Sequence, residues 1–229
     1  MRLVIRELTK LVDQKAVLDE ASYSFYHGKV YGLVAPKGVG KTALLNCISG
    51  EASYEGGTIM LEYDWKEVKP SYENMGMVYE NPILPDYMTG YEFVKYYLDV
   101  HKDKLAEGKT IDYYLKAAGI NDNNRNQLIR DYSSELKSRL QIMCVIIAKP
   151  EIILMDEPLS PNKTVKFQEM KHILDAIKKD SIIIYATNSE YVAKELCDEY
   201  VLLKSGVLYG CNEQIMKEVL DVREEEQDA

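Results

Sequence analysis

The sequence predicts an α/β fold with a mostly parallel central sheet and helices on both of its faces. Apolar runs at residues 30–34, 152–155 and 181–186 predict buried strands, and segments with helical spacing separate them. Because strands that alternate with helices usually pair in parallel, this order favours one sheet covered on two sides. The 229 residues, 46% of them hydrophobic, suffice for a single domain with a sizeable core.

The N-terminal part predicts antiparallel strands of a separate β subdomain. Residues 3–5 are apolar, and apolar side chains alternate with polar ones over residues 21–26. A glycine pair at 56–57 precedes another strand pattern, and residues 75–79 form a further one.

The middle of the chain predicts a helical subdomain, from about 89 to 148, inserted in the α/β core. Helix-like segments alternate there with polar, Asn-rich loops, and the last helix is expected from about 134 to 148. An acidic tail, about 222–229, is expected to fray, and all 229 residues are assigned to one domain.

The composition narrows the classes of function. The net charge of -9 argues against nucleic acid as a partner. The four cysteines are scattered and indicate reduced cytosolic thiols, without a disulfide framework or a metal site. No apolar run approaches the ~18 residues of a membrane span. We expect a cytoplasmic protein that reaches a membrane only through a partner.

The stretch APKGVGKT, residues 35–42, resembles a phosphate-binding loop between a strand and a helix that stops at Gly50. Ala35 stands where the pattern has glycine. The energetic cost of this alanine depends on whether the position needs a positive φ. Backbone N–H groups of such a loop bind phosphates, a lysine reaches the terminal phosphates, and a hydroxyl binds Mg²⁺. The candidate nucleotide contacts are Lys37, Gly38, Val39, Gly40, Lys41, Thr42 and Ala43.

A second motif, IILMDEP, follows about 115 residues later. Its apolar strand ends in Asp156 and Glu157, which places two carboxylates where a phosphate-bound Mg²⁺ and an attacking water could lie. Together the two motifs predict nucleotide binding.

The chain resembles the ATP-binding subunits of ABC transporters, which are P-loop NTPases, over nearly its whole length. The matching blocks, in order, are VLDEASYSFYHGKVYGLVAPKGVGKTALLNCISG, NMGMVYENPILPDYMTGYEF, DYSSELKSRLQIMCVIIAKPEIILMDEP and SIIIYATNSEYVAKELCDEYVLLKSG. The resemblance is strongest to cytosolic subunits of bacterial exporters. It implies ATP and Mg²⁺ as cofactors and ATP-driven dimer closure that powers transport.

The resemblance also implies roles for single residues. Glu157 would be the general base or would position the attacking water, and Lys41 would clamp the phosphates. Asp156 would anchor Mg²⁺ through water, and the Thr42 hydroxyl would bind the ion. Glu80 replaces the glutamine of the sensing loop and can still ligate a hard cation. Val12 stands where the family has an aromatic residue that stacks on adenine, so base stacking would be weaker or supplied elsewhere.

Three further departures concern the dimer. Ser133 keeps the serine of the signature motif, but Glu135 replaces a glycine and would be repelled from a γ-phosphate at ~4 Å by about 4 kcal/mol. Alternatively, Glu135 is simply an acidic residue in the first turn of a helix. Asn188 replaces the switch histidine and cannot be protonated, and Lys163 replaces an aspartate.

The damaged signature favours a heterodimer with an intact second ATP-binding subunit. A homodimer that hydrolyses slowly and acts as a switch is the rival. A regulatory partner that binds ATP without turnover also fits. A small-molecule kinase and a DNA-associated ATPase fit less well, because no arginine-rich lid and no long coiled coil is present.

The resemblance places the docking site of the membrane subunit between residues 82 and 97 (Pro82 to Tyr97). Apolar and aromatic residues gather there, namely Ile83, Leu84, Tyr87, Met88 and Tyr91. They form either a groove for a partner helix or the packing between subdomains. The substrate and the direction of transport cannot be read from these residues, although export is expected from the resemblance.

Overall fold

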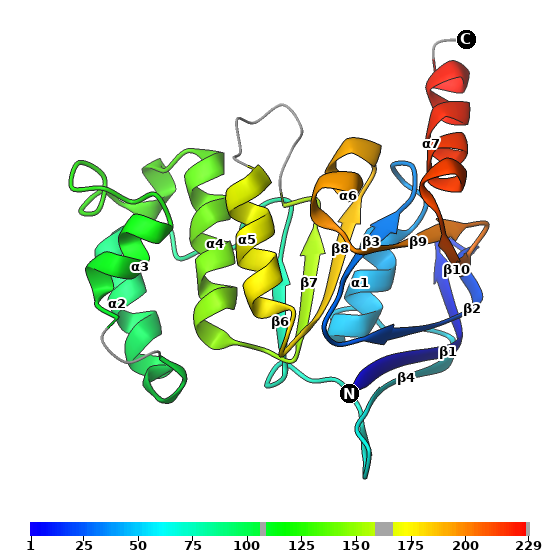
Figure 1. The fold of residues 1–229 in the computed structure, drawn as a ribbon, viewed down its shortest axis with the longest axis horizontal. Coiled ribbons are helices and arrows are strands. Elements are labelled where there is room, and N and C mark those ends of the chain that lie inside the picture. The colour runs from blue at the N-terminus through cyan, green and yellow to red at the C-terminus, as the bar shows by residue number, and fades with distance from the viewer. Residues whose placement is uncertain (106–108, 159–166, 228–229) are drawn as a thin grey trace.

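The predicted α/β fold is confirmed by the computed structural model, which describes residues 1–105, 109–158 and 167–227 (Figure 1). A six-stranded sheet has the order β10-β9-β3-β8-β7-β6, in which β10 pairs antiparallel with β9 and every other pair is parallel. Its strands are β3 (Val30–Val34), β6 (Met75–Val78), β7 (Ile152–Asp156), β8 (Ile182–Thr187), β9 (Glu199–Lys204) and β10 (Val207–Cys211). All residues of β3, β7 and β8 are buried, as expected for strands covered on both faces.

The second sheet is antiparallel and has the order β2-β1-β4-β5. Its strands are β1 (Arg2–Val12), β2 (Lys15–Tyr26), β4 (Gly56–Glu62) and β5 (Glu67–Val68). Helix α1 (Lys41–Ser49) packs against both sheets, because Leu44 and Leu45 share one hydrophobic core with residues of β1, β2, β3 and β7. This core holds the start of α1 next to the end of β3.

The helical part has a hydrophobic core of its own, to which Phe93, Leu115 and Leu140 belong. It contains α2 (Gly90–Val100), η1 (Lys102–Lys104), α3 (Ile111–Ala117), η2 (Ile129–Asp131) and α4 (Ser134–Ala148). Thr89 begins α2 with a capping box, since its hydroxyl accepts from Glu92 N and the Glu92 carboxylate accepts from Thr89 N. These helices lie at one end of the large sheet, beside β6 and β7 (Figure 1).

The remaining helices are α5 (Phe167–Ile177), α6 (Glu190–Leu196) and α7 (Glu213–Gln227). Helix α7 continues into the stretch 222–229, where the sequence predicts a frayed tail. The backbone is helical through Gln227, in line with the high helix propensity of the Glu, Arg and Gln residues there. No helix in the described part of the chain is both long and apolar enough to cross a bilayer.

Candidate nucleotide-binding site

The loop that follows β3 has the backbone of an anion site. Gly38 and Gly40 have φ angles of 81° and 121°, which residues with a side chain rarely adopt. Gly40 begins α1 without a side-chain cap, and the first turn of α1 has no acidic residue. The N–H groups and the positive end of the dipole at this helix start are therefore available to phosphate oxygens.

Ala35 causes no backbone strain in this loop. Its φ angle is not positive, and its methyl group is fully buried in the core that surrounds α1. The position therefore does not need glycine. Gly40 is the more demanding position, because a Cβ there would lie 3.2 Å from the Val17 carbonyl oxygen at a φ of 121°.

Lys41 is buried and already has partners in the protein. Its Nζ donates to the Ala35 carbonyl at 2.8 Å and to the Pro36 carbonyl at 3.3 Å. The same Nζ lies 3.3 Å from Glu157 Oε1. Glu157 has a φ of 42° directly after β7, and its N–H donates to the Ala186 carbonyl at 3.1 Å. Two residues separated by 116 positions thus form an ion pair at the carboxyl edge of the sheet.

Thr42 and Asp156 form the second contact between the two motifs. The Thr42 hydroxyl donates to Asp156 Oδ2 at 2.7 Å. Burial raises the pKa of Asp156; Thr42 and Lys41 oppose this rise, and Glu80 adds to it. Glu80 itself is exposed, shortly after the end of β6.

These oxygen atoms fit Mg²⁺ when the ion also binds phosphate. Hydroxyl and carboxylate oxygens are hard ligands, and Mg²⁺ commonly uses one or two carboxylates together with substrate phosphates and waters. No group of three or more His, Cys, Asp or Glu side chains in the described ranges is arranged to hold a metal alone. Thr42, Asp156 and Glu80 therefore suit a nucleotide-bound ion better than a permanent metal site.

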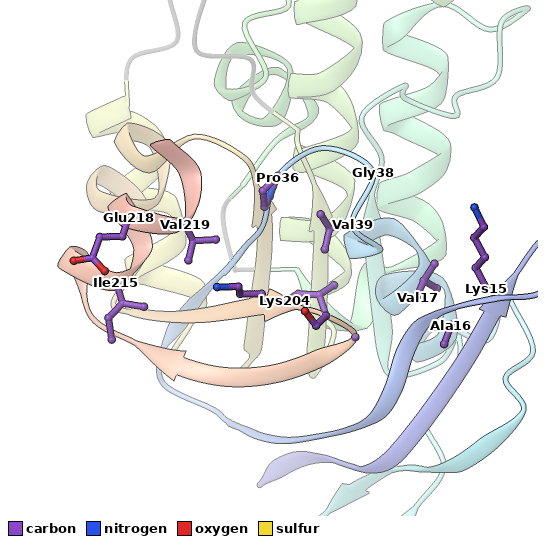
Figure 2. Close-up of a pocket in the computed structure, with 13 residues that line it drawn as sticks. Lys15, Ala16, Val17, Pro36, Gly38, Val39, Lys204, Ile215, Glu218 and Val219 are labelled. Atoms are coloured by element: carbon purple, nitrogen blue, oxygen red, sulfur yellow. The ribbon is translucent and has the colours of Figure 1, made fainter. Parts of the chain in front are cut away.

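A pocket of about 790 Å³ lies beside the loop (Figure 2). We call it the base pocket. The residues that line it come from β2, the loop, the β9–β10 hairpin and α7, and they are Lys15, Ala16, Val17, Pro36, Gly38, Val39, Leu203, Lys204, Ser205, Gly206, Ile215, Glu218 and Val219. Val12 is not among them; it ends β1 with 44% of its surface exposed. Lys37 is exposed in the loop, and Ala43 is half-buried in the first turn of α1.

The hairpin and α7 are parts of this pocket that the sequence interpretation missed. Ser205 and Gly206 form the two-residue turn between β9 and β10, both with positive φ. The Gly206 carbonyl accepts from Asp19 N at 3.0 Å and ties the turn to β2. The Ser-Gly dipeptide between two apolar runs was the available signal for this hairpin.

The signature residues Ser133 and Glu135 lie at the start of α4. The Ser133 hydroxyl caps α4 by accepting from Leu136 N at 3.2 Å. Glu135 pairs with Arg139 one turn later at 2.9 Å, so part of its charge is neutralised along the helix. Within the described residues, no hydrogen bond or ion pair joins Ser133 or Glu135 to Lys41, Asp156 or Glu157.

Asn188 is exposed directly after β8, the strand between β3 and β7. It therefore lies at the same edge of the sheet as Glu157. Lys163, the replacement for the aspartate after the second motif, falls outside the described residues.

The expected docking segment divides into two groups. Tyr87 and Ile83 are 83% and 72% exposed. Leu84, Met88 and Tyr91 pack against the core of the helical part. Internal packing therefore accounts for the second group, whereas Ile83 and Tyr87 remain available to a partner.

Comparisons with known proteins agree with this geometry. A family model described as ABC transporter matches residues 18–160. Among curated proteins, the chain is 27% identical to the uncharacterized ABC transporter ATP-binding protein YdbJ of Bacillus subtilis, covering 98% of this chain and 75% of YdbJ. It is 30% identical to the uncharacterized ABC transporter ATP-binding protein MJ1023 of Methanocaldococcus jannaschii, covering 95% and 80%. It is 28% identical to the Fe(3+) ions import ATP-binding protein FbpC of Fusobacterium nucleatum, covering 90% and 56%.

Solved structures share the fold. The ATP-binding subunit of an ABC transporter superposes with a TM-score of 0.77 at 17% identity, over 95% of this chain and 93% of that one. A bacterial Atm1-family ABC exporter with ATP bound gives a TM-score of 0.77 at 16% identity, over 100% of this chain and 42% of that one. At these identities the likeness concerns the fold alone. With a family model that matches more than half of its residues, the chain belongs to the ABC transporter ATP-binding family.

Proposed function

We propose that this chain binds MgATP and hydrolyses it as the cytoplasmic motor subunit of an ABC transporter. The observation that carries the proposal is the meeting of Lys41 and Thr42 with Glu157 and Asp156 at the carboxyl edge of the sheet. One motif supplies the cation and the hydroxyl, and the other supplies both carboxylates. Phosphoryl transfer from ATP needs these groups at one place.

The residues would act as follows. Phosphate oxygens accept hydrogen bonds from the N–H groups of the loop and from Lys41 Nζ, which leaves Glu157 when the nucleotide enters. Glu157, then unpaired, orients the attacking water and accepts its proton. Asn188 donates its amide hydrogen to the γ-phosphate but brings no charge. Lys37, Gly38, Val39, Gly40 and Ala43 line the phosphates with backbone N–H groups.

Magnesium, when bound, neutralises charge on the phosphates and orients them for in-line attack. Thr42 would give its hydroxyl oxygen to the ion, and Asp156 would hold it directly or through water. Glu80 would take the place of the sensing-loop glutamine. Burial raises the pKa of Asp156. A cation at this position would lower that pKa and thereby favour the ionised carboxylate.

We infer that the chain works in a heterodimer with a second ATP-binding subunit. Glu135 remains 39% exposed in its pair with Arg139, so a negative group stays close to the helix start that would cap the partner's ATP. Ser133 accepts from Leu136 N through its hydroxyl oxygen, so its O–H can still donate to the partner's nucleotide. Two such chains would form two impaired caps, whereas an intact partner would complete the site around Lys41.

A membrane subunit is the second partner that we propose. Tyr87 and Ile83 supply an apolar surface next to the loop that carries Glu80. A movement of this loop on nucleotide binding would be transmitted to the membrane subunit at this surface.

We propose export as the direction of transport and a position of this chain at the inner face of the membrane. Relatives named as importers of iron and of spermidine and putrescine show that import occurs among similar chains, so import is the rival of this proposal. Transport by inside-out vesicles decides between them.

A catalytically impaired regulatory subunit is the alternative, and Glu135 and Asn188 favour it. Such a subunit would bind ATP and close the dimer without turnover of its own.

Phosphate release by the purified chain alone tests the heterodimer proposal. The proposal predicts slow release, because each site would meet an impaired cap. Vigorous release that Glu157→Gln abolishes would show that a homodimer is the active form. Glu199→Gln, in an exposed pair with Lys29, is the matched control and should leave the rate unchanged.

A further inference from the structure

One wall of the base pocket belongs to α7, an element that no recognised motif includes. Ile215, Glu218 and Val219 line the pocket from α7, across from Val17 of β2 (Figure 2). Gly38 and Val39 of the phosphate loop line the same pocket. A ligand whose phosphates lie on the loop can therefore extend its other end between β2 and α7.

Packing at its first turn holds α7 in this orientation. Met216 is fully buried and packs with Val34 and Ala193. Asn212 accepts from Ile215 N at 3.0 Å, and Glu213 pairs with Lys194 at 3.4 Å. The cap thus begins the helix, and the apolar contact and the ion pair fix its start to β3 and α6.

Ile215 and Val219 share one face of α7, because they are four residues apart in a helix. Met216 packs into the core, and the adjacent face of α7, which carries Ile215 and Val219, lines the pocket. Ile215 is 42% exposed and Val219 is partly exposed. Their apolar surface faces a cavity large enough for a nucleoside and is not covered by the protein.

The opposite side of the nucleotide site lacks an aromatic ring. Val12, at the position that the family resemblance assigns to stacking, does not line the pocket. Val17 does line it and is apolar but small. A purine base gains from apolar contact on both of its faces, so a second apolar surface across from Val17 has a physical role.

We propose that Ile215 and Val219 contact the base of ATP on the face opposite Val17, so that α7 forms part of the nucleotide site. This inference rests on the proposed binding of ATP. It assigns the recognition of the base largely to residues of β2 and α7, whereas the loop binds the phosphates. Loss of the α7 contacts should therefore weaken the binding of ATP and leave the binding of a ligand that has only phosphates unchanged.

Titration calorimetry with two probes, MgATP and magnesium tripolyphosphate, tests the inference. The double variant Ile215→Ala/Val219→Ala keeps helix propensity high and should bind ATP about tenfold more weakly. Tripolyphosphate should bind it as it binds the unchanged chain. Lys217→Ala, on α7 but outside the pocket lining, is the control and should affect neither probe. Equal ATP affinity of the double variant and the control would overturn the inference.

A fluorescence measurement covers the case in which the alanine variant folds poorly. The chain has one tryptophan, Trp65, so Ile215→Trp in a Trp65→Phe background reports on the pocket alone. ATP should quench this signal and bind more tightly, whereas tripolyphosphate should leave the signal unchanged. No quenching by ATP at saturation would refute the contact. If the unchanged chain binds neither probe, the proposed ATP binding fails and this inference fails with it.

Discussion

Glu157→Gln should tighten the binding of ATP at the same time as it stops hydrolysis. In the free protein, Lys41 Nζ lies 3.3 Å from Glu157 Oε1, and the side chain of Lys41 is only 5% exposed. An incoming γ-phosphate must draw Lys41 away from this carboxylate. Part of the free energy of phosphate binding is therefore used to separate the pair, and the glutamine variant does not have this cost.

The distance sets the scale of the effect. Coulomb's law gives about 5 kcal/mol for charges 3.3 Å apart at an effective dielectric constant of ~20, which is an upper bound. Glu157 is 26% exposed, so solvent and side-chain entropy reduce the net value to about 1–2 kcal/mol. Since 1.4 kcal/mol corresponds to a factor of ten, ATP should bind about tenfold more tightly. Removing the repulsion between Glu157 and the γ-phosphate adds to this gain.

Calorimetry with a non-hydrolysable ATP analogue measures the affinity without turnover. The free variant should also melt at a lower temperature than the unchanged protein, because Lys41 loses its acidic partner in a buried place. Saturation with the analogue should remove most of this difference. Glu199→Gln is the control and should change neither quantity. An affinity of the folded Glu157→Gln variant that is equal to or weaker than that of the unchanged chain would refute the reasoning.

Three further predictions concern the loop, the metal and the docking surface. Burial raises the pKa of Asp156, so its ionised form destabilises the free protein as pH rises through that pKa. Asp156→Asn should therefore raise the melting temperature at neutral pH, less so in acid, while it weakens Mg²⁺-dependent ATP binding in calorimetry. Ala35→Gly should lower the free energy of unfolding by about 1 kcal/mol without raising ATP affinity, because the φ of Ala35 is already accessible; tighter binding would contradict this. Tyr87→Asp should leave melting temperature and ATP affinity unchanged and reduce transport, since Tyr87 is 83% exposed; a lower melting temperature would instead indicate packing.

The parts that could be predicted from sequence are local or follow from parallel strand order. The loop 35–42 is one continuous stretch between a strand and a helix, so its context is visible in the residues themselves. Asp156 ends an apolar strand, and parallel strands bring their carboxyl ends to one edge. The α/β class and the edge at which Thr42 and Asp156 meet followed from these patterns alone.

The parts that could not be predicted depend on contacts between distant segments. Glu157 pairs with Lys41 in the free protein and has a positive φ, and no residue pattern indicates either feature. The wall that α7 contributes is held by Met216, which packs with Val34 although the two residues are far apart in the sequence. Val12 shows that a position along the chain does not by itself give a place in the pocket. The resemblance assigns base stacking to Val12 at the end of β1, but the pocket lining begins beyond the β1–β2 turn, at Lys15. Motif spacing gives the position of a residue along the chain, whereas the pocket depends on how the elements pack.

Phosphate release by the complete transporter is the most direct test of whether this chain is a motor subunit. The complex of this chain with its membrane and second ATP-binding partners should be measured with unchanged Glu157 and with Glu157→Gln. The account predicts that the substitution lowers the rate by at least about a hundredfold at the site held by this chain, the usual scale for loss of a general base. An unchanged rate, with ATP still bound to the variant chain, would contradict hydrolysis by this chain and identify it as the regulatory subunit.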